Sequence, residues 1–90
     1  MNLEELRVQI DQIDRQIVEL YVQRMETVSR ISAYKREHGL AVYDPARENV
    51  LLERVAGQAG PRYAEDVRRL FRILLTLSKE AQERERQDGI

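Results

Sequence analysis

Two cations on the first predicted helix occupy positions where helix packing alone would place apolar side chains. Arg24 falls at a heptad position that carries isoleucine at Ile17 and Ile31. An unpaired charge buried among apolar groups costs several kcal/mol, so this arginine either reaches solvent or meets an anion. Lys35 follows after almost three helical turns, so it faces nearly the same direction about 16 Å along the axis. These two side chains are candidate ligands for an anion.

A third cation on this helix points elsewhere. Arg7 precedes Arg24 by a spacing that rotates it about 100° away from the Arg24 face. One helix therefore cannot direct Arg7, Arg24 and Lys35 toward one point. Two antiparallel copies can, because the N-terminal part of one copy would lie beside the middle of the other. The three cations thus predict a homodimer of antiparallel copies with basic pockets suited to a small organic dianion.

Polar side chains also interrupt the apolar face of the last predicted helix. Ser78 and Gln82 lie within about 60° of the direction shared by Phe71 and Leu75. Buried polar side chains require hydrogen-bond partners. Ser78 and Gln82 are therefore candidate ligand contacts.

A further group lies at the start of the second predicted helix. Asp44 suits the N-cap position, and Pro45 suits the first helical position, where its missing N–H costs nothing. Arg47 and Glu48 follow within one turn, able to pair with each other or with a ligand. We include Asp44, Arg47 and Glu48 among the candidate substrate-binding residues.

Each candidate also has a purely structural interpretation. Arg24 could reach solvent or pair with a local carboxylate, and Ser78 and Gln82 could lie at the rim of the core. Lys35 complements the helix macrodipole, and Asp44 is explained as a cap. We favour a ligand site because all of these structural explanations would have to hold at once in one short domain.

The side chains are positioned by helices, the first of which is very long. No Gly or Pro interrupts the stretch from Leu3 to His38, where apolar residues recur at spacings of three and four. Gly39 suits the left-handed conformation just past a helix end. Such a helix is about 54 Å long, whereas a compact chain of this size has a radius of gyration of about 12 Å. The helix therefore needs a partner to cover it.

Two shorter helices complete an all-α, three-helix protomer. The second is predicted from Pro45 to Ala56, and the turn cluster Gly57–Pro61 ends it. The third starts near Pro61 or Arg62 and runs into the polar tail 83–90, which is expected to fray. Residues 1–90 form a single domain, with no internal repeat and no linker.

Composition narrows the function classes. The chain has 15 basic and 16 acidic residues, which disfavours a nucleic-acid partner. It has no cysteine and one histidine, so no disulfide framework, thiolate site or histidine metal cluster is expected. No apolar run approaches the length of a membrane span, and the acidic N-terminus does not resemble a signal peptide. We expect a cytoplasmic protein with no metal, no cofactor and no membrane partner.

Taken together, these residues resemble the small all-helical chorismate mutases, the AroQ class. The resemblance covers Leu3 to about Arg84, and its most specific piece is the Asp-Pro-x-Arg-Glu stretch, residues 44–48. The other matching elements are Leu6-Arg7, Ile10-Asp11, Ile13-Asp14, Arg24, Lys35, Leu70-Phe71, Ser78 and Gln82.

The resemblance implies an intertwined dimer in which Arg7 reaches the active site of the partner chain, while Arg24 and Lys35 come from the long helix. It implies that Arg47 and Glu48 lie near the ring hydroxyl of chorismate. By the same resemblance, Ser78 lies near a carboxylate. Lys35 and Gln82 would then address the ether oxygen.

The implied reaction, the rearrangement of chorismate to prephenate in aromatic amino-acid biosynthesis, agrees with the composition. This pericyclic step needs no nucleophile, metal or cofactor. It needs a dianion held in a compact, near-attack shape and donors aimed at the ether oxygen, where negative charge grows. The candidate catalytic residues are Arg7, Arg24, Lys35 and Gln82.

Two other functions stay open at this point. A lyase on the same scaffold would bind the dianion isochorismate with the same cationic side chains and eliminate pyruvate from it. The Arg47-Glu48 pair favours the mutase. A non-catalytic dimerisation or regulatory module would explain the long helix, but it leaves Arg24, Ser78 and Gln82 without a purpose.

Overall fold

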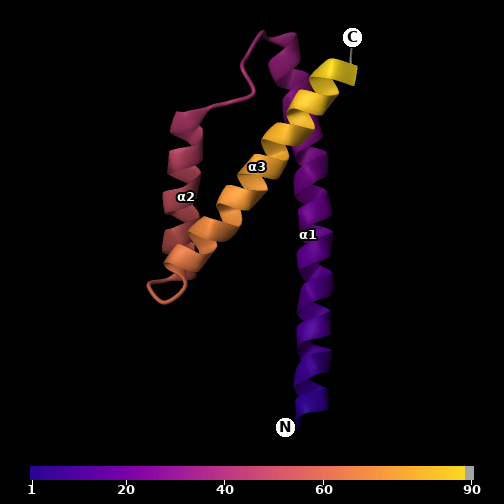
Figure 1. The fold of residues 1–90 in the computed structure, drawn as a ribbon, viewed down its shortest axis with the longest axis vertical. Coiled ribbons are helices and arrows are strands. Elements are labelled where there is room, and N and C mark those ends of the chain that lie inside the picture. The colour runs from indigo at the N-terminus through magenta and orange to yellow at the C-terminus, as the bar shows by residue number, and fades with distance from the viewer. Residues whose placement is uncertain (89–90) are drawn as a thin grey trace.

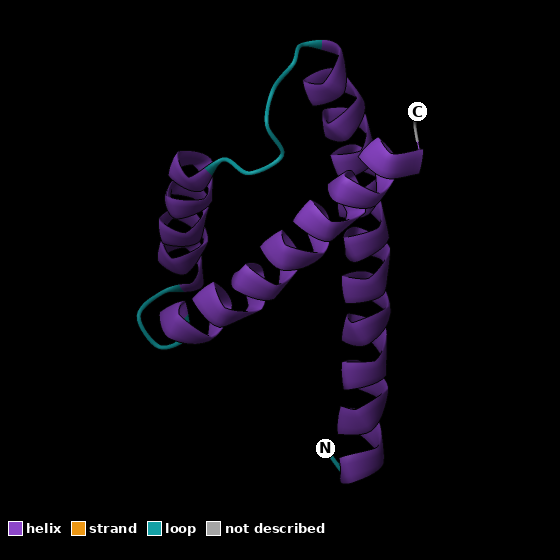
Figure 2. Cartoon of the chain, turned by 45° about the horizontal axis from the view of Figure 1, so that its top comes forward, coloured by secondary structure: helices purple, strands orange, loops and turns teal. Residues whose placement is uncertain are grey.

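The fold consists of three α-helices in the computed structural model, which describes residues 1–88 (Figure 2). They are α1 (Leu3–Glu37), α2 (Pro45–Ala59) and α3 (Ala64–Asp88). No strand occurs within the described residues. The predicted all-α class and the very long first helix are confirmed.

Both ends of α1 are capped, the C-terminal end by the predicted Gly39. The Asn2 side chain accepts a hydrogen bond from the backbone N–H of Glu5 at 2.9 Å. At the other end, Gly39 has a φ of 66°, a left-handed conformation that residues with a Cβ rarely adopt. The N–H of Leu40 then bonds the carbonyl of Lys35 at 2.8 Å, and that of Gly39 bonds the carbonyl of Arg36, which is a Schellman motif.

Helix α2 begins as predicted but ends later. The Asp44 carboxylate accepts a hydrogen bond from the N–H of Arg47 at 3.1 Å, and Pro45 is the first helical residue. The predicted end at Ala56 is wrong, because the helix continues through Gly57 to Ala59. A glycine inside a helix costs only about 1 kcal/mol relative to alanine. The helix stops at Gly60, whose φ of 83° leaves the helical region.

Helix α3 differs from its prediction at both ends. It begins at Ala64 rather than near Pro61 or Arg62, because residues 61–63 form a turn. It is regular from Glu83 to Asp88, where fraying was expected; residues 89 and 90 of that tail lie outside the described part. Two long-range hydrogen bonds hold this end: Arg36 of α1 donates to the Glu85 carbonyl at 3.2 Å, and Arg86 donates to the carbonyl of Leu40, which follows α1.

The arrangement is open rather than globular. Helix α3 crosses diagonally and packs on α2 near its start and on the C-terminal half of α1 near its end (Figure 1). Within residues 1–88, α1 and α2 do not pack on each other. The radius of gyration is 16.4 Å, against about 12 Å for a compact chain of this length. The open space between α1 and α2 is therefore bridged by α3 alone.

The buried core is small and lies where α3 meets its neighbours. Its apolar members are Val28, Val42, Leu51, Val55 and Ala56. The N-terminal half of α1 contributes none of them, and its large apolar side chains are exposed. These are Leu3, Leu6, Val8, Ile10, Ile13, Ile17, Val18, Leu20 and Val22. None of the described helices is both long enough and apolar enough to span a bilayer.

An ion pair joins α2 to α3 outside the core, and it yields a pH-dependent prediction. Arg68 contacts Glu53 at 2.9 Å, and this hydrogen bond, together with the charge of Arg68, lowers the pKa of Glu53 below its usual value. A carboxyl whose pKa is lowered by folding stabilises the fold above its unfolded pKa and loses that contribution as the pH falls through the folded pKa. Glu53→Gln should therefore lower the melting temperature at about pH 7 and lower it by less at about pH 3, which is below the unfolded pKa.

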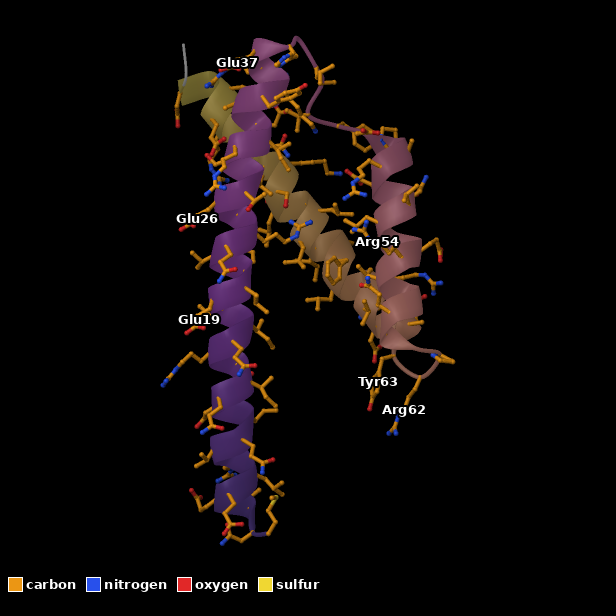
Figure 3. All side chains as sticks on the ribbon, turned by 180° about the vertical axis from the view of Figure 1, so that it is seen from behind. Glu19, Glu26, Glu37, Arg54, Arg62 and Tyr63 are labelled. Atoms are coloured by element: carbon orange, nitrogen blue, oxygen red, sulfur yellow. The ribbon has the colours of Figure 1, made fainter. Side chains whose placement is uncertain are left out.

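Thermal unfolding of Glu53→Gln and the parent protein at the two pH values measures this difference. Glu26→Gln is the control, because Glu26 projects from the side of α1 that faces away from the other helices (Figure 3). An equal loss at both pH values would contradict the role given to the Glu53–Arg68 pair.

Candidate active site

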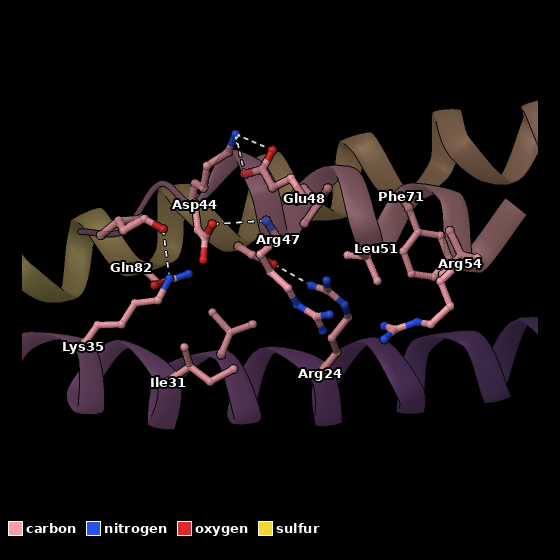
Figure 4. A pocket seen from close by; sticks show the side chains of 16 residues that line it. Arg24, Ile31, Lys35, Asp44, Arg47, Glu48, Leu51, Arg54, Phe71 and Gln82 are labelled. Carbon is pink, nitrogen blue, oxygen red and sulfur yellow. Dashed lines mark hydrogen bonds and ion pairs between the residues drawn. The ribbon is translucent and has the colours of Figure 1, made fainter. Parts of the chain in front are cut away.

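A cavity of about 500 Å³ lies between the C-terminal half of α1, helix α2 and the middle of α3 (Figure 4). Its apolar lining comes from Val28, Ile31, Val42, Leu51, Val55, Phe71 and Leu75. Its polar lining comes from Arg24, Lys35, Asp44, Arg47, Glu48, Arg54, Ser78, Lys79 and Gln82. The cavity is large enough for a small organic ligand.

Seven of the eight candidate site residues line this cavity. Arg24 and Lys35 both face it from α1, as their spacing predicts. Arg7 does not reach it: its side chain is 63% exposed and lies 3.5 Å from Glu4 near the start of α1. In the single chain described, the cavity therefore contains two of the three predicted cations, Arg24 and Lys35, and not Arg7.

Arg24 is held in the cavity wall by a neutral partner. Its guanidinium donates to the Ser78 hydroxyl at 2.5 Å, and that hydroxyl donates to the Leu74 carbonyl at 2.7 Å. Burial lowers the pKa of Arg24, Tyr21 opposes this effect, and the charge of Arg47 acts in the same direction as burial. Arginine keeps its charge despite such a shift. Arg24 is thus a fixed, partly desolvated cation with no carboxylate partner among residues 1–88.

Lys35 and Gln82 lie together at one end of the cavity (Figure 4). The Lys35 ammonium donates to the Val42 carbonyl at 3.0 Å, which fixes one of its three N–H bonds and leaves two for a ligand. Gln82 is only 6% exposed, and its Oε1 atom is enclosed without a hydrogen-bond partner. Its amide nitrogen carries two N–H donors, and the residue lines the same cavity as Lys35. This end of the cavity therefore presents N–H donors.

Asp44, Arg47 and Glu48 lie at the α2 side of the cavity, as expected from their positions in one helical turn. The Asp44 carboxylate is engaged in capping α2. Arg47 and Glu48 do not pair with each other in the described chain. Glu48 instead contacts Lys79, with 3.1 Å between Nζ and Oε2.

Two cations of the site, Arg54 and Lys79, escaped the sequence analysis. Arg54 lies two helical turns after Arg47, so the spacing alone could have placed it on the same face of α2. Lys79 directly follows Ser78 and comes from α3. Only the tertiary structure shows that it meets Glu48, which is 31 residues earlier in the chain.

The electrostatics of the cavity oppose those of the whole chain. Five cations and two carboxylates line it, a surplus of three positive charges, whereas the chain carries a net charge of −1. No cluster of three or more His, Cys, Asp or Glu side chains placed to hold a metal ion occurs in the described chain. The arrangement is suited to binding a small, rigid anion by several charge-assisted hydrogen bonds.

Comparison with known proteins agrees with this geometry. A family model described as chorismate mutase type II matches residues 6–83. The chain belongs to the chorismate mutase type II family. This membership confirms the predicted resemblance and, with it, the assignment as an isomerase domain.

Two curated relatives are T-proteins. The chain is 41% identical over 51 residues to the T-protein of Haemophilus influenzae, and 38% identical over 47 residues to that of Enterobacter agglomerans. These stretches cover 57% and 52% of this chain. They span only 14% and 13% of the two relatives, so the chain corresponds to a small part of each.

The environment of Arg24 predicts a conflict between ligand binding and stability. Arg24 is desolvated by burial and has only a neutral hydrogen-bond partner, so the empty site is destabilised by its charge. Replacement of Arg24 by Met should raise the free energy of unfolding by about 1 kcal/mol, which is typical of relieving a functional strain. Urea unfolding measures the change.

The matched control is Arg30→Met, which removes an exposed arginine from the same helix. It should change stability by less than about 0.5 kcal/mol. A clear loss of stability in Arg24→Met would mean that the arginine stabilises the fold rather than serving to bind a ligand.

Proposed function

We propose that this chain converts chorismate to prephenate by stabilising one pericyclic transition state. The observation that carries the proposal is the cavity, in which Arg24, Lys35 and Arg47 have no carboxylate partner among the described residues. Membership of the chorismate mutase type II family supports the same substrate. The cations that the fold leaves without a counter-charge would be neutralised by the two carboxylates of chorismate.

The proposed roles follow from what each end of the cavity offers. Arg24, supported by Ser78, binds one carboxylate through its planar guanidinium fork, and Arg7 of the partner subunit assists at the dianion. Arg47 and Glu48 lie at the ring hydroxyl. At the other end, Lys35 and Gln82 donate hydrogen bonds to the ether oxygen.

The chemistry needs no group beyond these. In the rearrangement, the C–O bond of the enolpyruvyl ether breaks while a C–C bond forms to the ring, so all atoms stay within one molecule. Holding the two carboxylates brings the reacting carbons together and removes the entropy cost of the compact conformer. The donors from Lys35 and Gln82 stabilise the charge that develops on the oxygen, an effect typically worth about 2.7–4 kcal/mol per donor.

A homodimer completes the proposed site. The chain exposes 7138 Å², roughly 1,600 Å² more than a compact monomer of its size. Burying that excess on each of two copies matches the interface size of obligate homodimers. The apolar side chains exposed along the N-terminal half of α1, defined above, are the surface that a second copy would cover. Arg7 lies on the same half of α1 and would enter the partner's cavity.

The first test is turnover of chorismate by the purified protein without added cofactor. The parent protein should produce prephenate, and Arg24→Ala should lower kcat/KM by about 30-fold or more while the protein keeps its oligomeric state, since a buried charged contact typically costs about 2–5 kcal/mol. An active Arg24→Ala protein would show that the site is misplaced.

Two further measurements separate the alternatives. Isochorismate is assayed beside chorismate, and release of pyruvate from it in preference to prephenate formation would identify a lyase. A bicyclic dianionic transition-state mimic should raise the melting temperature, because a ligand that binds only the folded state stabilises it. No shift at high ligand concentration would favour a non-catalytic dimerisation module.

The shared site yields a separate prediction about mixed dimers. Arg7→Ala and Arg24→Ala should each be inactive as homodimers. In a dimer with one subunit of each kind, one site has both arginines and the other has neither. Unfolding the two variants together and refolding them should therefore restore about a quarter of the parent activity, because half of the dimers are mixed and each has one intact site.

Activity of the refolded mixture is compared with that of each variant refolded alone. No recovery, in a mixture shown by mass to contain mixed dimers, would mean that Arg7 acts within its own chain or not at all.

A further inference from the structure

Lys79 is a cation in the cavity wall that the proposed clamp does not use. It comes from α3, immediately after Ser78, and its side chain is 34% exposed. Its ammonium lies 3.1 Å from Oε2 and 3.3 Å from Oε1 of Glu48, so it contacts both oxygens of that carboxylate. Figure 4 shows the two contacts at the α2 side of the cavity.

The same ammonium makes a second contact, with an aromatic ring. Lys79 Nζ lies 4.8 Å from the centre of the Tyr43 ring, within the range of a cation–π interaction. Tyr43 belongs to the connection between α1 and α2, and Glu48 belongs to the first turn of α2. Lys79 therefore ties α3 to both segments at one corner of the cavity.

Glu48 shares the cavity wall with other cations. Arg47 is its neighbour in the chain, and Arg24 also lines the wall. If Glu48 paired with Arg24, it would neutralise the guanidinium that binds a substrate carboxylate in the proposed site, and if it paired with Arg47, neither side chain would be free for the ring hydroxyl. In the structure its ion-pair partner is Lys79, which leaves both guanidinium groups without a carboxylate.

The geometry also leaves Glu48 able to accept another hydrogen bond. An ionised carboxylate has about four lone-pair sites, and Lys79 occupies one on each oxygen. Glu48 keeps 20% of its side chain exposed and lines the cavity. The remaining sites can accept a hydrogen bond from a hydroxyl group of a bound ligand.

We propose that Lys79, seated on the Tyr43 ring, is a positioning residue that holds the Glu48 carboxylate as the acceptor for the substrate's ring hydroxyl and away from Arg24 and Arg47. This inference rests on the proposed function, because it assigns the specificity of the same site. Lys79 touches Glu48 and not the reacting atoms. Its contribution should therefore appear in the recognition of the hydroxyl rather than in activity as a whole.

The test compares chorismate with an analogue in which hydrogen replaces the ring hydroxyl, in the parent protein and in Lys79→Met. The parent should prefer chorismate, and Lys79→Met should reduce the ratio of the two kcat/KM values by about tenfold or more, the factor expected when a hydrogen bond to a charged group is lost. The KM for chorismate should also rise, because Glu48 would turn toward the arginines.

Three further variants complete the test. Lys79→Arg keeps a cation at this corner and should retain most of the discrimination. Arg84→Met removes an exposed cation from the same helix and should leave the ratio unchanged. In a Glu48→Gln background, Lys79→Met should change the ratio by less than about twofold, because the two residues act as one unit.

The outcomes are distinct. A Lys79→Met protein that loses activity equally on both substrates, with a lower melting temperature, would show a purely structural ion pair and overturn the inference. An unchanged ratio would overturn it as well. Failure of the folded parent dimer to convert either substrate would overturn the proposed function itself, whereas turnover with an unaltered ratio would overturn only the role of Lys79.

Discussion

The length of α1 is the constraint on which the other features of this structure depend. A helix of 35 residues in a chain of 90 leaves too few residues to surround it. Helix α3 packs against its C-terminal half, and among the helices of residues 1–88 only α3 packs on α2. The space between α1 and α2 therefore stays open, and it is this space that the charged side chains line. A more compact arrangement of the same helices would fill the cavity with apolar contacts.

Arg24 and Lys35 are kept apart from the carboxylates of this cavity rather than neutralised by them. Arg24 is supported by Ser78, and Lys35 by a backbone carbonyl, so both are fixed by neutral groups. The acidic residues are occupied elsewhere: Asp44 caps α2 and Glu48 pairs with Lys79. Preorganised cations of this kind need not reorganise when an anion arrives, which is the property that makes electrostatic stabilisation effective in a partly water-excluded site.

The sequence was sufficient to predict those helix ends that depend on residues close together in the chain. The heptad pattern, Gly39 and the Asp44-Pro45 pair predicted the limits of α1 and the start of α2, because capping depends on a few neighbouring residues. The end of α2 was missed because Gly57 penalises a helix too weakly to stop it. The contacts of Lys79 were missed because they depend on how α3 crosses α2. Arg7 stays a prediction, since its place depends on a second chain.

The two walls of the cavity are joined chiefly through α3, and this has a consequence for how the site could change. The width of the cavity depends on the angle at which α3 crosses its neighbours, and small buried residues such as Ala56, only 3% exposed, leave no room for a larger side chain without a shift of the helices. Substitutions at these helix contacts would widen or narrow the cavity without altering its charged lining. Selection for a bulkier ligand would therefore change the distances between the helices, while the charged side chains that line the cavity stayed the same.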